Sequence, residues 1–264
     1  MASHFGLAAS VAAHPSREGV WASCGADRQL LVCSASATMP MQRLLLPSPA
    51  HCVAYSADGA LLATGHDDGA IVVLRAGGGG GGGGGPLPAQ ASGGSGAVEV
   101  ISFAPSSSAA GGLVACGCHD RMVRVLELRQ EARPGSAGGF ATGAAPRLQL
   151  VPRFVCSGHT ATATHLDWSA DGSILMSNCA AHEILVWNVA DKGQRLAQPG
   201  RALATAQWAS WTCYLGFPCM GIWPDGSDST DVNSCHLSSD KALLLVSGAG
   251  LAPPPLPCVP CHRR

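Results

Sequence analysis

The stretch Thr164–Trp187, THLDWSADGSILMSNCAAHEILVW, has the pattern of three short strands joined by two turns. Its first turn, Ser169–Gly172, makes a tight reversal, because Asp accepts hydrogen bonds from the backbone that comes after it and Gly adopts a positive φ. The segments on either side alternate or run apolar, which is typical of half-buried or buried strands. The stretch therefore predicts an antiparallel sheet of short strands.

The same unit occurs in three segments that precede this stretch. These are Leu7–Ser34, His51–Leu74 and Val98–Leu126. Once two insertions are removed, the copies recur at roughly the 40 to 45 residues of a four-stranded propeller blade. A generic β-sandwich of short strands is the alternative, but one unit that recurs in one order favours the repeat.

The insertions are rich in glycine and cover residues 76–96 and 129–145. Neither can bury much apolar surface and glycine is costly to order, so we expect flexible, disordered loops at the blade edges. A phosphate-binding loop would need a Lys-Ser or Lys-Thr and a following helix, which the run Gly77–Gly85 lacks. The predicted domain spans 5–247, and residues 248–264 form a disordered tail whose prolines cannot pair in a sheet.

The amino-acid composition argues against two classes of function, nucleic-acid binding and membrane binding. The 264 residues are 47% hydrophobic and 12% charged, with a net charge of −1 and no basic block. Nucleic-acid binding needs clustered Lys and Arg, so we expect none. No apolar run reaches the roughly 18 residues of a membrane span, so we expect no membrane contact. The twelve cysteines are scattered through strand-like segments, which indicates reduced, core-filling thiols in the cytosol.

Gly158-His159 and Trp187-Asn188 bracket the fourth copy and resemble the Gly-His and Trp-Asp pairs of the WD-repeat family. The resemblance implies an all-β WD-repeat β-propeller, incomplete here, with about four blades and the start of a fifth. It also implies a hydrogen-bonded network of His159, a turn Asp, a Ser or Thr, and Trp187.

The turn aspartate of this network stands six residues before the end of the third strand of a copy. The first three copies have it as Asp27, Asp68 and Asp120. The fourth copy has Ala181 at this place, which predicts an interrupted network there. Replacing Ala181 by Asp is then expected to stabilise the fourth blade by about 1 kcal/mol.

The stretch Trp208–Asp231, WASWTCYLGFPCMGIWPDGSDSTD, comes directly after the fourth copy. It resembles a distinctive segment of the echinoderm microtubule-associated protein-like (EMAP-like) family, and the blade before it agrees. The resemblance covers roughly residues 5–247 apart from the insertions, and it corresponds to part of that family's second propeller.

The resemblance implies a non-enzymatic scaffold that binds tubulin or microtubules. It places the protein in the cytoplasm on the cytoskeleton, with the cilium as a further setting, and it implies that a longer chain supplies the remaining blades. The alternative is a general WD-repeat interaction scaffold for another cytosolic or ciliary complex. The partners that co-purify with the chain discriminate between the two.

The aromatic residues of Trp208–Asp231 have two interpretations. Bracing between blades comes first, since large aromatic side chains bury much apolar area and the prolines stiffen the connections. A partner-contact surface comes second. Its residues would be Trp211, Phe217, Trp223, Asp225, Asp228 and Asp231. The aspartates do not match a calcium loop, which needs oxygens at alternate positions and a final Glu.

Other ligand-type residues predict no cofactor, metal or catalytic site. The tail segment 258–262 has the Cys-x-x-Cys-His spacing of a haem attachment motif, but no helical domain surrounds it. Cys116, Cys118 and His119 offer zinc-type ligands, yet two thiols on one strand and a turn His do not make a tetrahedral site. A propeller enzyme is the third hypothesis, but no nucleophile elbow or convergent acidic cluster supports it.

Overall fold

The computed structural model describes residues 4–76, 89–105, 112–131, 147–216, 232–238 and 242–248. Apart from turns and loops, this part of the chain is β-strand, with one short helix, α1 (Pro199–Thr205). None of its helices is long and apolar enough to cross a membrane. The predicted tail from residue 249 onward lies outside the described residues, as do parts of both insertions.

Four antiparallel sheets of four strands follow one another along the chain, and we call them blades 1 to 4. Blade 1 contains β1 (Ala8–Ala13), β2 (Val20–Gly25), β3 (Gln29–Ser34) and β4 (Gln42–Leu45). Blade 2 contains β5 (Ala50–Tyr55), β6 (Leu61–His66), β7 (Ala70–Arg75) and β8 (Ala89–Ser92). Blade 3 contains β9 (Val98–Phe103), β10 (Leu113–Cys118), β11 (Val123–Glu131) and β12 (Arg147–Cys156). Blade 4 contains β13 (Ala163–Trp168), β14 (Ile174–Cys179), β15 (Ile184–Asn188) and β16 (Gln194–Arg195).

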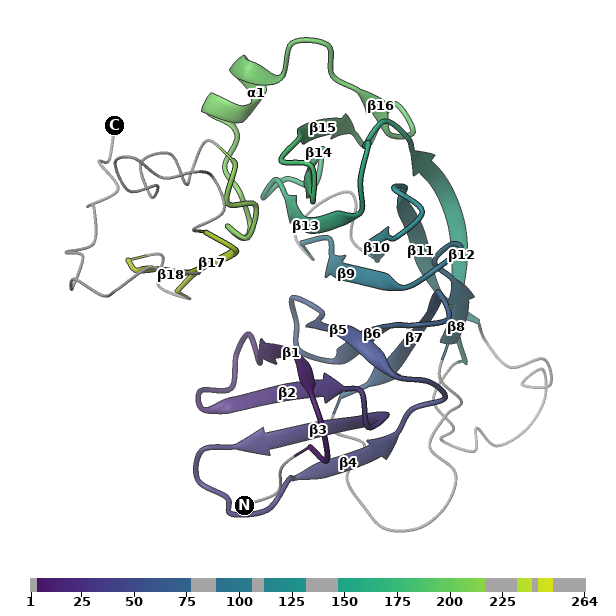
Figure 1. The fold of residues 1–264 in the computed structure, drawn as a ribbon, viewed down its shortest axis with the longest axis vertical. Coiled ribbons are helices and arrows are strands. Elements are labelled where there is room, and N and C mark those ends of the chain that lie inside the picture. The colour runs from purple at the N-terminus through teal and green to yellow at the C-terminus, as the bar shows by residue number, and fades with distance from the viewer. Residues whose placement is uncertain are drawn as a thin grey trace, which may run out of the picture.

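The blades are arranged as an arc, with the first strands β1, β5, β9 and β13 side by side (Figure 1). Each blade is a simple meander in which neighbours in sequence are neighbours in the sheet. The prediction of an all-β, propeller-type fold built from a repeated blade is therefore confirmed.

Hydrogen bonds within the turns reverse the chain between neighbouring strands of a blade. In blade 2 the Ser56 hydroxyl donates to Asp58 at 2.6 Å and accepts from the N–H of Leu61 at 2.9 Å. Gly59 has φ 71°, and a Cβ on it would lie 2.3 Å from the His14 ring. The turn Ser169–Gly172 of blade 4 repeats this hydrogen bonding, so both turns adopt the tight reversal that their sequence predicts.

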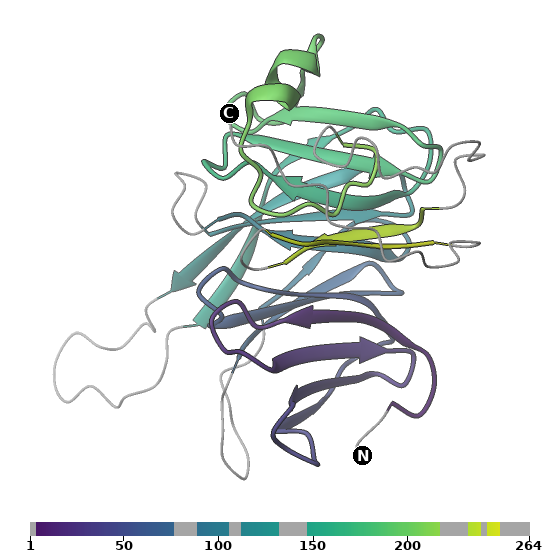
Figure 2. The same ribbon diagram turned by 90° about the vertical axis from the view of Figure 1, so that its left-hand side faces the viewer.

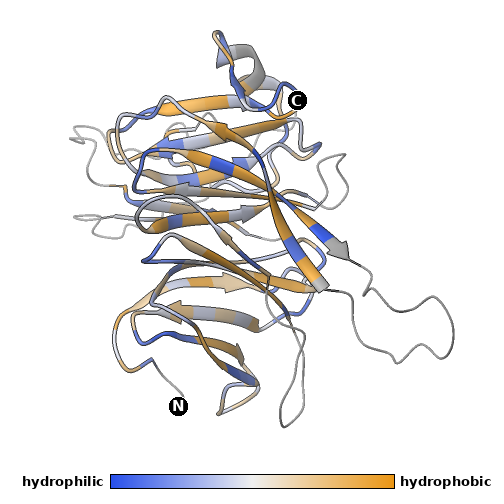
Figure 3. Cartoon of the chain, turned by 90° about the vertical axis from the view of Figure 1, so that its right-hand side faces the viewer, coloured by the Kyte–Doolittle hydropathy of each residue, from blue (hydrophilic) through white to orange (hydrophobic). Residues whose placement is uncertain are grey.

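Three hydrophobic cores join successive blades. We call the face of a blade that packs on the preceding blade its leading face, and the opposite face its trailing face. In blade 2 the leading face carries Val53 and Leu62, whereas the trailing face carries Ala63 and Ile71. Figure 3 shows hydrophobic residues along the strands of these stacked blades. Full burial of one large apolar side chain contributes about 1.5–3 kcal/mol, so the blade junctions are the main source of stability.

The two insertions are shorter than the sequence predicts. Ala89–Ser92, within the first of them, forms β8 and pairs with β7, and Ala89 is only 3% exposed. The start of the second lies in β11, which runs to Glu131. A short segment such as AQAS carries no recognisable strand pattern, but the free edge of β7 supplies backbone partners for any sequence.

The chain continues past blade 4 beside β13. Trp208 forms a bridge with Ser169, and the N–H of Ala209 donates to the carbonyl of Trp168 at 2.9 Å. A two-stranded hairpin of β17 (Ser234–Leu237) and β18 (Leu244–Ser247) comes next. Figure 1 shows it on the open side of the arc, and Figure 2 shows it from that side. The predicted fifth blade thus begins as a hairpin.

Candidate functional site

One position on the second strand of every blade is structurally equivalent. It is occupied by Ser23, Thr64, Cys116 and Ser177, which pair with corresponding residues of the first strands. The residue four positions later stands in the turn to the third strand, and it is Asp27, Asp68, Asp120 or Ala181. We call the polar contacts around these two positions the blade network, and the edge of the molecule that carries these turns the turn rim.

Blade 1 has the most complete network. His4 lies between Asp27 and Ser23, with its Nδ1 2.9 Å from Asp27 Oδ1 and its Nε2 2.9 Å from Ser23 Oγ. The N–H groups of Phe5 and Gln29 also donate to the Asp27 carboxylate. Burial raises the pKa of Asp27, but these hydrogen bonds outweigh it, so the pKa lies below its usual value. The sequence analysis missed His4, although it precedes Ser23 by nearly the same distance as His159 precedes Ser177.

In blade 4, Ser177 joins His159 to Trp187. Ser177 Oγ lies 2.6 Å from His159 Nε2 and accepts a hydrogen bond of 2.8 Å from Trp187 Nε1. The His159 ring also meets the Trp187 ring edge-on, with 6.0 Å between centroids. These contacts tie the entry of the blade to its third strand.

Glu183 places a carboxylate near the position where the other blades have the turn aspartate. Its Oε2 accepts from the N–H of Thr160 at 2.8 Å and lies 3.6 Å from His159 Nδ1. At 3.6 Å the Glu183 carboxylate is too far for a hydrogen bond, and His159 Nδ1 is buried without a hydrogen-bond partner among the described residues, so the interruption at Ala181 stays a prediction. The longer Glu side chain reaches back from two residues further along the chain. A carboxylate near the turn, rather than at one fixed position, would have been the signal to search for.

In blade 3 the partner of the turn aspartate is an arginine instead of a histidine. Arg124 donates twice to the Asp120 carboxylate, at 3.0 and 2.6 Å. The N–H of Ser95 also donates to Asp120, as that of Phe5 donates to Asp27 in blade 1. Burial raises the pKa of Asp120, but the hydrogen bonds lower it further, so the carboxyl is ionised at neutral pH.

Blade 2 splits the network into two parts. Thr64 Oγ1 lies 2.9 Å from Nε2 of His66, whose Nδ1 is 3.0 Å from the Ser48 carbonyl. Asp68 accepts from the N–H of Ala70 and so caps the turn on its own. Burial lowers the pKa of His66, which favours the neutral ring.

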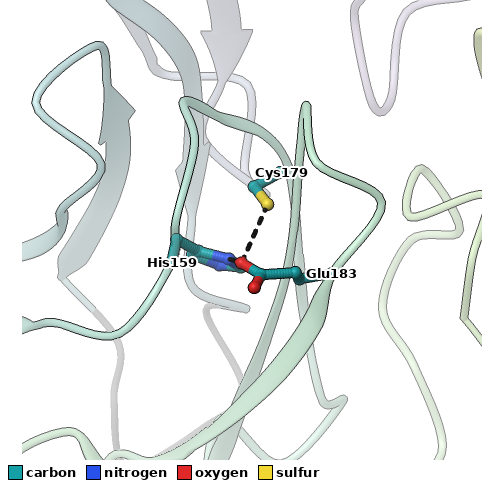
Figure 4. A group of neighbouring side chains, drawn as sticks. All are labelled: His159, Cys179 and Glu183. Carbon is teal, nitrogen blue, oxygen red and sulfur yellow. Dashed lines mark hydrogen bonds and ion pairs between the residues drawn. The ribbon is translucent and has the colours of Figure 1, made fainter.

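His159, Cys179 and Glu183 are the described residues whose ligand atoms converge as a metal site would require (Figure 4). The three atoms lie within 4.8 Å of one another. The Cys179 thiol donates to Glu183 at 3.3 Å, and burial lowers the pKa of His159. The carboxylate is thus already shared by a backbone N–H and a thiol, and this arrangement suits a structural brace.

Asp167 anchors the segment that opens the stretch Trp208–Asp231. It is fully buried on β13 and accepts hydrogen bonds from the Ser210 hydroxyl, both donors of Thr212, and the N–H of Cys213, at 2.6–3.0 Å. Burial raises the pKa of this carboxyl despite those donors. The sequence analysis did not single out Asp167, because an acidic residue inside an apolar strand signals a partner without identifying it.

Trp211 is half-buried between two small cores. One contains Tyr214, Val232 and Cys235, and the other contains Met176, Trp208 and Cys213. It thus packs where a brace between blade 4 and the hairpin would pack. The other residues of the predicted contact surface, Phe217, Trp223, Asp225, Asp228 and Asp231, lie outside the described residues.

A chain of close histidine–carboxylate contacts crosses the turn rim between blades 2 and 3. Glu99 Oε1 lies 2.7 Å from His119 Nε2 and 3.5 Å from His51 Nδ1, and His51 also contacts Asp67. These side chains are partly or largely solvent-exposed. Such a surface offers charge and hydrogen bonds to a partner.

The rim turns also present basic residues in an uncommon backbone conformation. Arg28, Arg121 and His182 are exposed at the same place of their turns, with φ of 59°, 66° and 57°. Blade 2 has Gly69 there, with φ 79°. A non-glycine residue in this region costs about 1–2 kcal/mol, so three blades retain a side chain at a place where glycine would fit better.

Comparison with known proteins identifies the family of this chain. The family model for the echinoderm microtubule-associated protein second beta-propeller matches residues 9–250. The chain is 32% identical over 235 residues to echinoderm microtubule-associated protein-like 2 of Rattus norvegicus, which covers 89% of this chain and 32% of the relative. It is 30% identical over 234 residues to the human echinoderm microtubule-associated protein-like 3, covering 89% of this chain and 23% of the relative.

A third relative is the 77 kDa echinoderm microtubule-associated protein of Strongylocentrotus purpuratus, 29% identical over 234 residues. That match covers 89% of this chain and 30% of the relative. The chain therefore spans about a third or less of the length of these relatives.

Proposed function

Because the chain belongs to the echinoderm microtubule-associated protein-like family, we propose that it is a non-enzymatic scaffold that binds tubulin or microtubules through its propeller blades. The observation that carries the proposal is the family match over residues 9–250. The relatives are named for association with microtubules, which favours a cytoskeletal setting for this chain as well. In blades 1 and 4 the histidines of the network are held by hydrogen bonds within the blade, which favours a structural role over catalysis.

The turn rim is the surface that we assign to the partner. It combines the exposed Arg28 and Arg121 with the chain of histidine–carboxylate contacts around Glu99. Backbone strain is retained where function requires a side chain, and both arginines occupy the left-handed region that glycine fills in blade 2. Charged rims act mainly on association rate and specificity.

The test is size-exclusion chromatography of the full 264-residue chain with soluble αβ-tubulin. We expect the wild-type chain to co-elute with tubulin, and the double variant Arg28→Gly/Arg121→Gly to lose the shifted peak. Glycine relieves the positive φ, so this variant should fold at least as stably as the wild type.

The matched control is Arg17→Ala, which removes an exposed arginine in the β1–β2 turn at the opposite end of the same blade. It should bind tubulin like the wild type. A wild-type chain that ignores tubulin but retains another cytosolic protein would contradict the proposal and favour a general interaction scaffold. Equal loss in the control and in the rim variant would contradict the assignment of the turn rim.

A further inference from the structure

Blade 4 leaves one ring nitrogen of its network histidine without a hydrogen bond. In blade 1, Nδ1 of His4 lies 2.9 Å from the Asp27 carboxylate. In blade 4, Ala181 stands at the place of that aspartate, and His159 Nδ1 has no hydrogen-bond partner among the described residues. The His159 side chain is 0% exposed, so water does not reach this nitrogen either. A buried polar atom without a partner is costly and points to a ligand that the blade itself does not supply.

Two further metal-binding groups lie close to this nitrogen. Glu183 Oε2 is 3.6 Å from His159 Nδ1 and 3.3 Å from the Cys179 thiol, and the three ligand atoms lie within 4.8 Å of one another. Figure 4 shows the three side chains pointing toward one another. Blade 1 has Gly25 and Gln29 at the places of Cys179 and Glu183, so it lacks both the thiol and the carboxylate.

We propose that His159, Cys179 and Glu183 bind a structural zinc ion. Zinc takes imidazole nitrogen, thiolate sulfur and carboxylate oxygen as ligands, whereas calcium and magnesium take oxygen. A tetrahedral zinc ion with bonds of about 2.0–2.3 Å holds its ligand atoms roughly 3.3–3.6 Å apart. Both distances from Glu183 already lie in this range. The remaining pair, Cys179 and His159, needs at most a small approach.

The surrounding hydrogen bonds hold these groups in forms that can bind the metal. With the ring proton of His159 on Nε2, that N–H donates to Ser177 Oγ at 2.6 Å, and Nδ1 keeps a lone pair for the metal. The N–H of Thr160 lowers the pKa of Glu183, so the carboxylate is ionised at neutral pH. Zinc binding replaces the thiol proton of Cys179, which goes to solvent. The thiolate and the carboxylate then balance the two positive charges of the ion.

The position of the site explains what the ion does for the blade. His159 lies before β13, Cys179 ends β14, and Glu183 directly precedes β15, so one ion joins three segments of blade 4. The Glu183 side chain is 33% exposed, which gives the ion a path from solvent and leaves room for a water as the fourth ligand. Zinc thus gives His159 Nδ1 the partner that Asp27 gives His4 in blade 1.

The test is titration of the metal-free 264-residue chain with Zn²⁺ in competition with a chromophoric chelator. We expect Cys179→Ala and Glu183→Gln each to weaken zinc binding at least about 100-fold, because even an outer-shell partner of a zinc ligand contributes about 10–100-fold. The glutamine oxygen can still accept from the Thr160 N–H, so Glu183→Gln keeps that hydrogen bond and decides the question if Cys179→Ala fails to fold.

The matched control is Cys156→Ala, which removes an equally buried thiol from the core between blades 3 and 4. It should bind zinc like the reference chain. All proteins in the comparison, including the reference, carry Cys258→Ser and Cys261→Ser, so that the Cys-x-x-Cys-His segment does not compete for the metal.

Cobalt reports the ligands directly, because a thiolate bound to tetrahedral Co²⁺ gives a charge-transfer band in the near ultraviolet. The band should appear in the reference chain and in Cys156→Ala and be absent from Cys179→Ala, with native strand content by circular dichroism in all three. A reference chain that binds no zinc, or binding that is equal in Cys179→Ala or equally lost in Cys156→Ala, would overturn the proposal. Tubulin is absent from these measurements, so their result is independent of the proposed function.

Discussion

Blades 1 and 4 share one register, but they are covered by different elements on their trailing faces. Blade 1 packs against a complete blade, and its trailing face carries small or apolar residues such as Ala12 and Ser10. Blade 4 packs against an irregular segment, and the equivalent positions hold Asp167 and His165. A sheet that packs on a sheet needs only apolar contact, whereas an irregular segment brings backbone N–H groups that need acceptors.

The leading faces of the two blades also carry different residues according to whether a neighbouring blade covers them. Trp187 is 1% exposed against the core of blade 3, whereas Cys33 at the equivalent position of blade 1 is half-buried. A large aromatic residue stabilises a blade only where a neighbour covers it. The same repeat therefore carries different residues according to what packs on each face.

The largest effect should come from the residue that blade 1 lacks. Trp187→Ala removes a buried aromatic ring and the donor to Ser177, and it should lower the free energy of unfolding by about 3–5 kcal/mol. Cys33→Ala, its counterpart in blade 1, should cost less than about 1 kcal/mol. Urea titration followed by circular dichroism measures both, and equal losses would remove the contrast between the blades.

Variants of Asp167 test whether blade 4 needs a hydrogen-bond acceptor for the irregular segment that packs on it. Asp167→Ala leaves the N–H groups of Thr212 and Cys213 without an acceptor, and it should cost about 2–4 kcal/mol, at about 1–2 kcal/mol for each of the two buried donors. Asp167→Asn should cost about 1 kcal/mol, because its oxygen can serve both N–H groups while its NH₂ faces the two hydroxyls, which can accept. If Asn proves as damaging as Ala, charge rather than hydrogen bonding holds the segment.

His165 gives blade 4 a pH dependence that Ser10 cannot give blade 1. Burial lowers the pKa of His165 to about 4, below the usual value of about 6.5. A lowered histidine pKa means that the folded state prefers the neutral ring. Its contribution to stability is therefore complete above about pH 6.5 and is lost as the pH falls toward 4, by about 1–3 kcal/mol.

The variant His165→Phe fills the same place with a ring that does not titrate. Urea midpoints between pH 7.5 and pH 4.5 should fall less steeply in this variant than in the wild type. Parallel curves for the two proteins would show that the acid sensitivity lies elsewhere.

The smallest effect concerns the carboxylate of the blade 4 network. Glu183→Ala should lower the melting temperature, because the Thr160 N–H loses its acceptor. Ala181→Asp should recover stability in that background and add about 1 kcal/mol in the wild type, because His159 Nδ1 makes no hydrogen bond to Glu183. An unchanged or lowered melting temperature of Ala181→Asp in the wild type would contradict the prediction of an interrupted network.

The repeat itself was readable from sequence because its signals are local. Turns such as Ser56–Gly59 and strands with period-two apolar pattern depend on residues within a few positions of each other, so they predict blades and their order. The family resemblance also came from a contiguous stretch, Trp208–Asp231, and the family comparison agrees with it.

Contacts between distant segments were decided only by the tertiary structure. Three contacts depend on partners brought together from elsewhere in the chain: Glu183 accepts from the Thr160 N–H, His4 reaches Asp27, and β8 forms from AQAS. Hydrogen bonds across such distances leave no periodic trace in a sequence.

The sequence by itself determined the strand–turn pattern, the number of repeated units and the family, because short-range sterics and turn chemistry act within each unit. The tertiary structure alone decided which side chains close each network, that Asp167 is buried under the segment after blade 4, and that Trp187 is buried while its counterpart Cys33 is half-buried. Burial depends on which surfaces meet, and a repeat with nearly the same sequence is covered or open according to its place in the series.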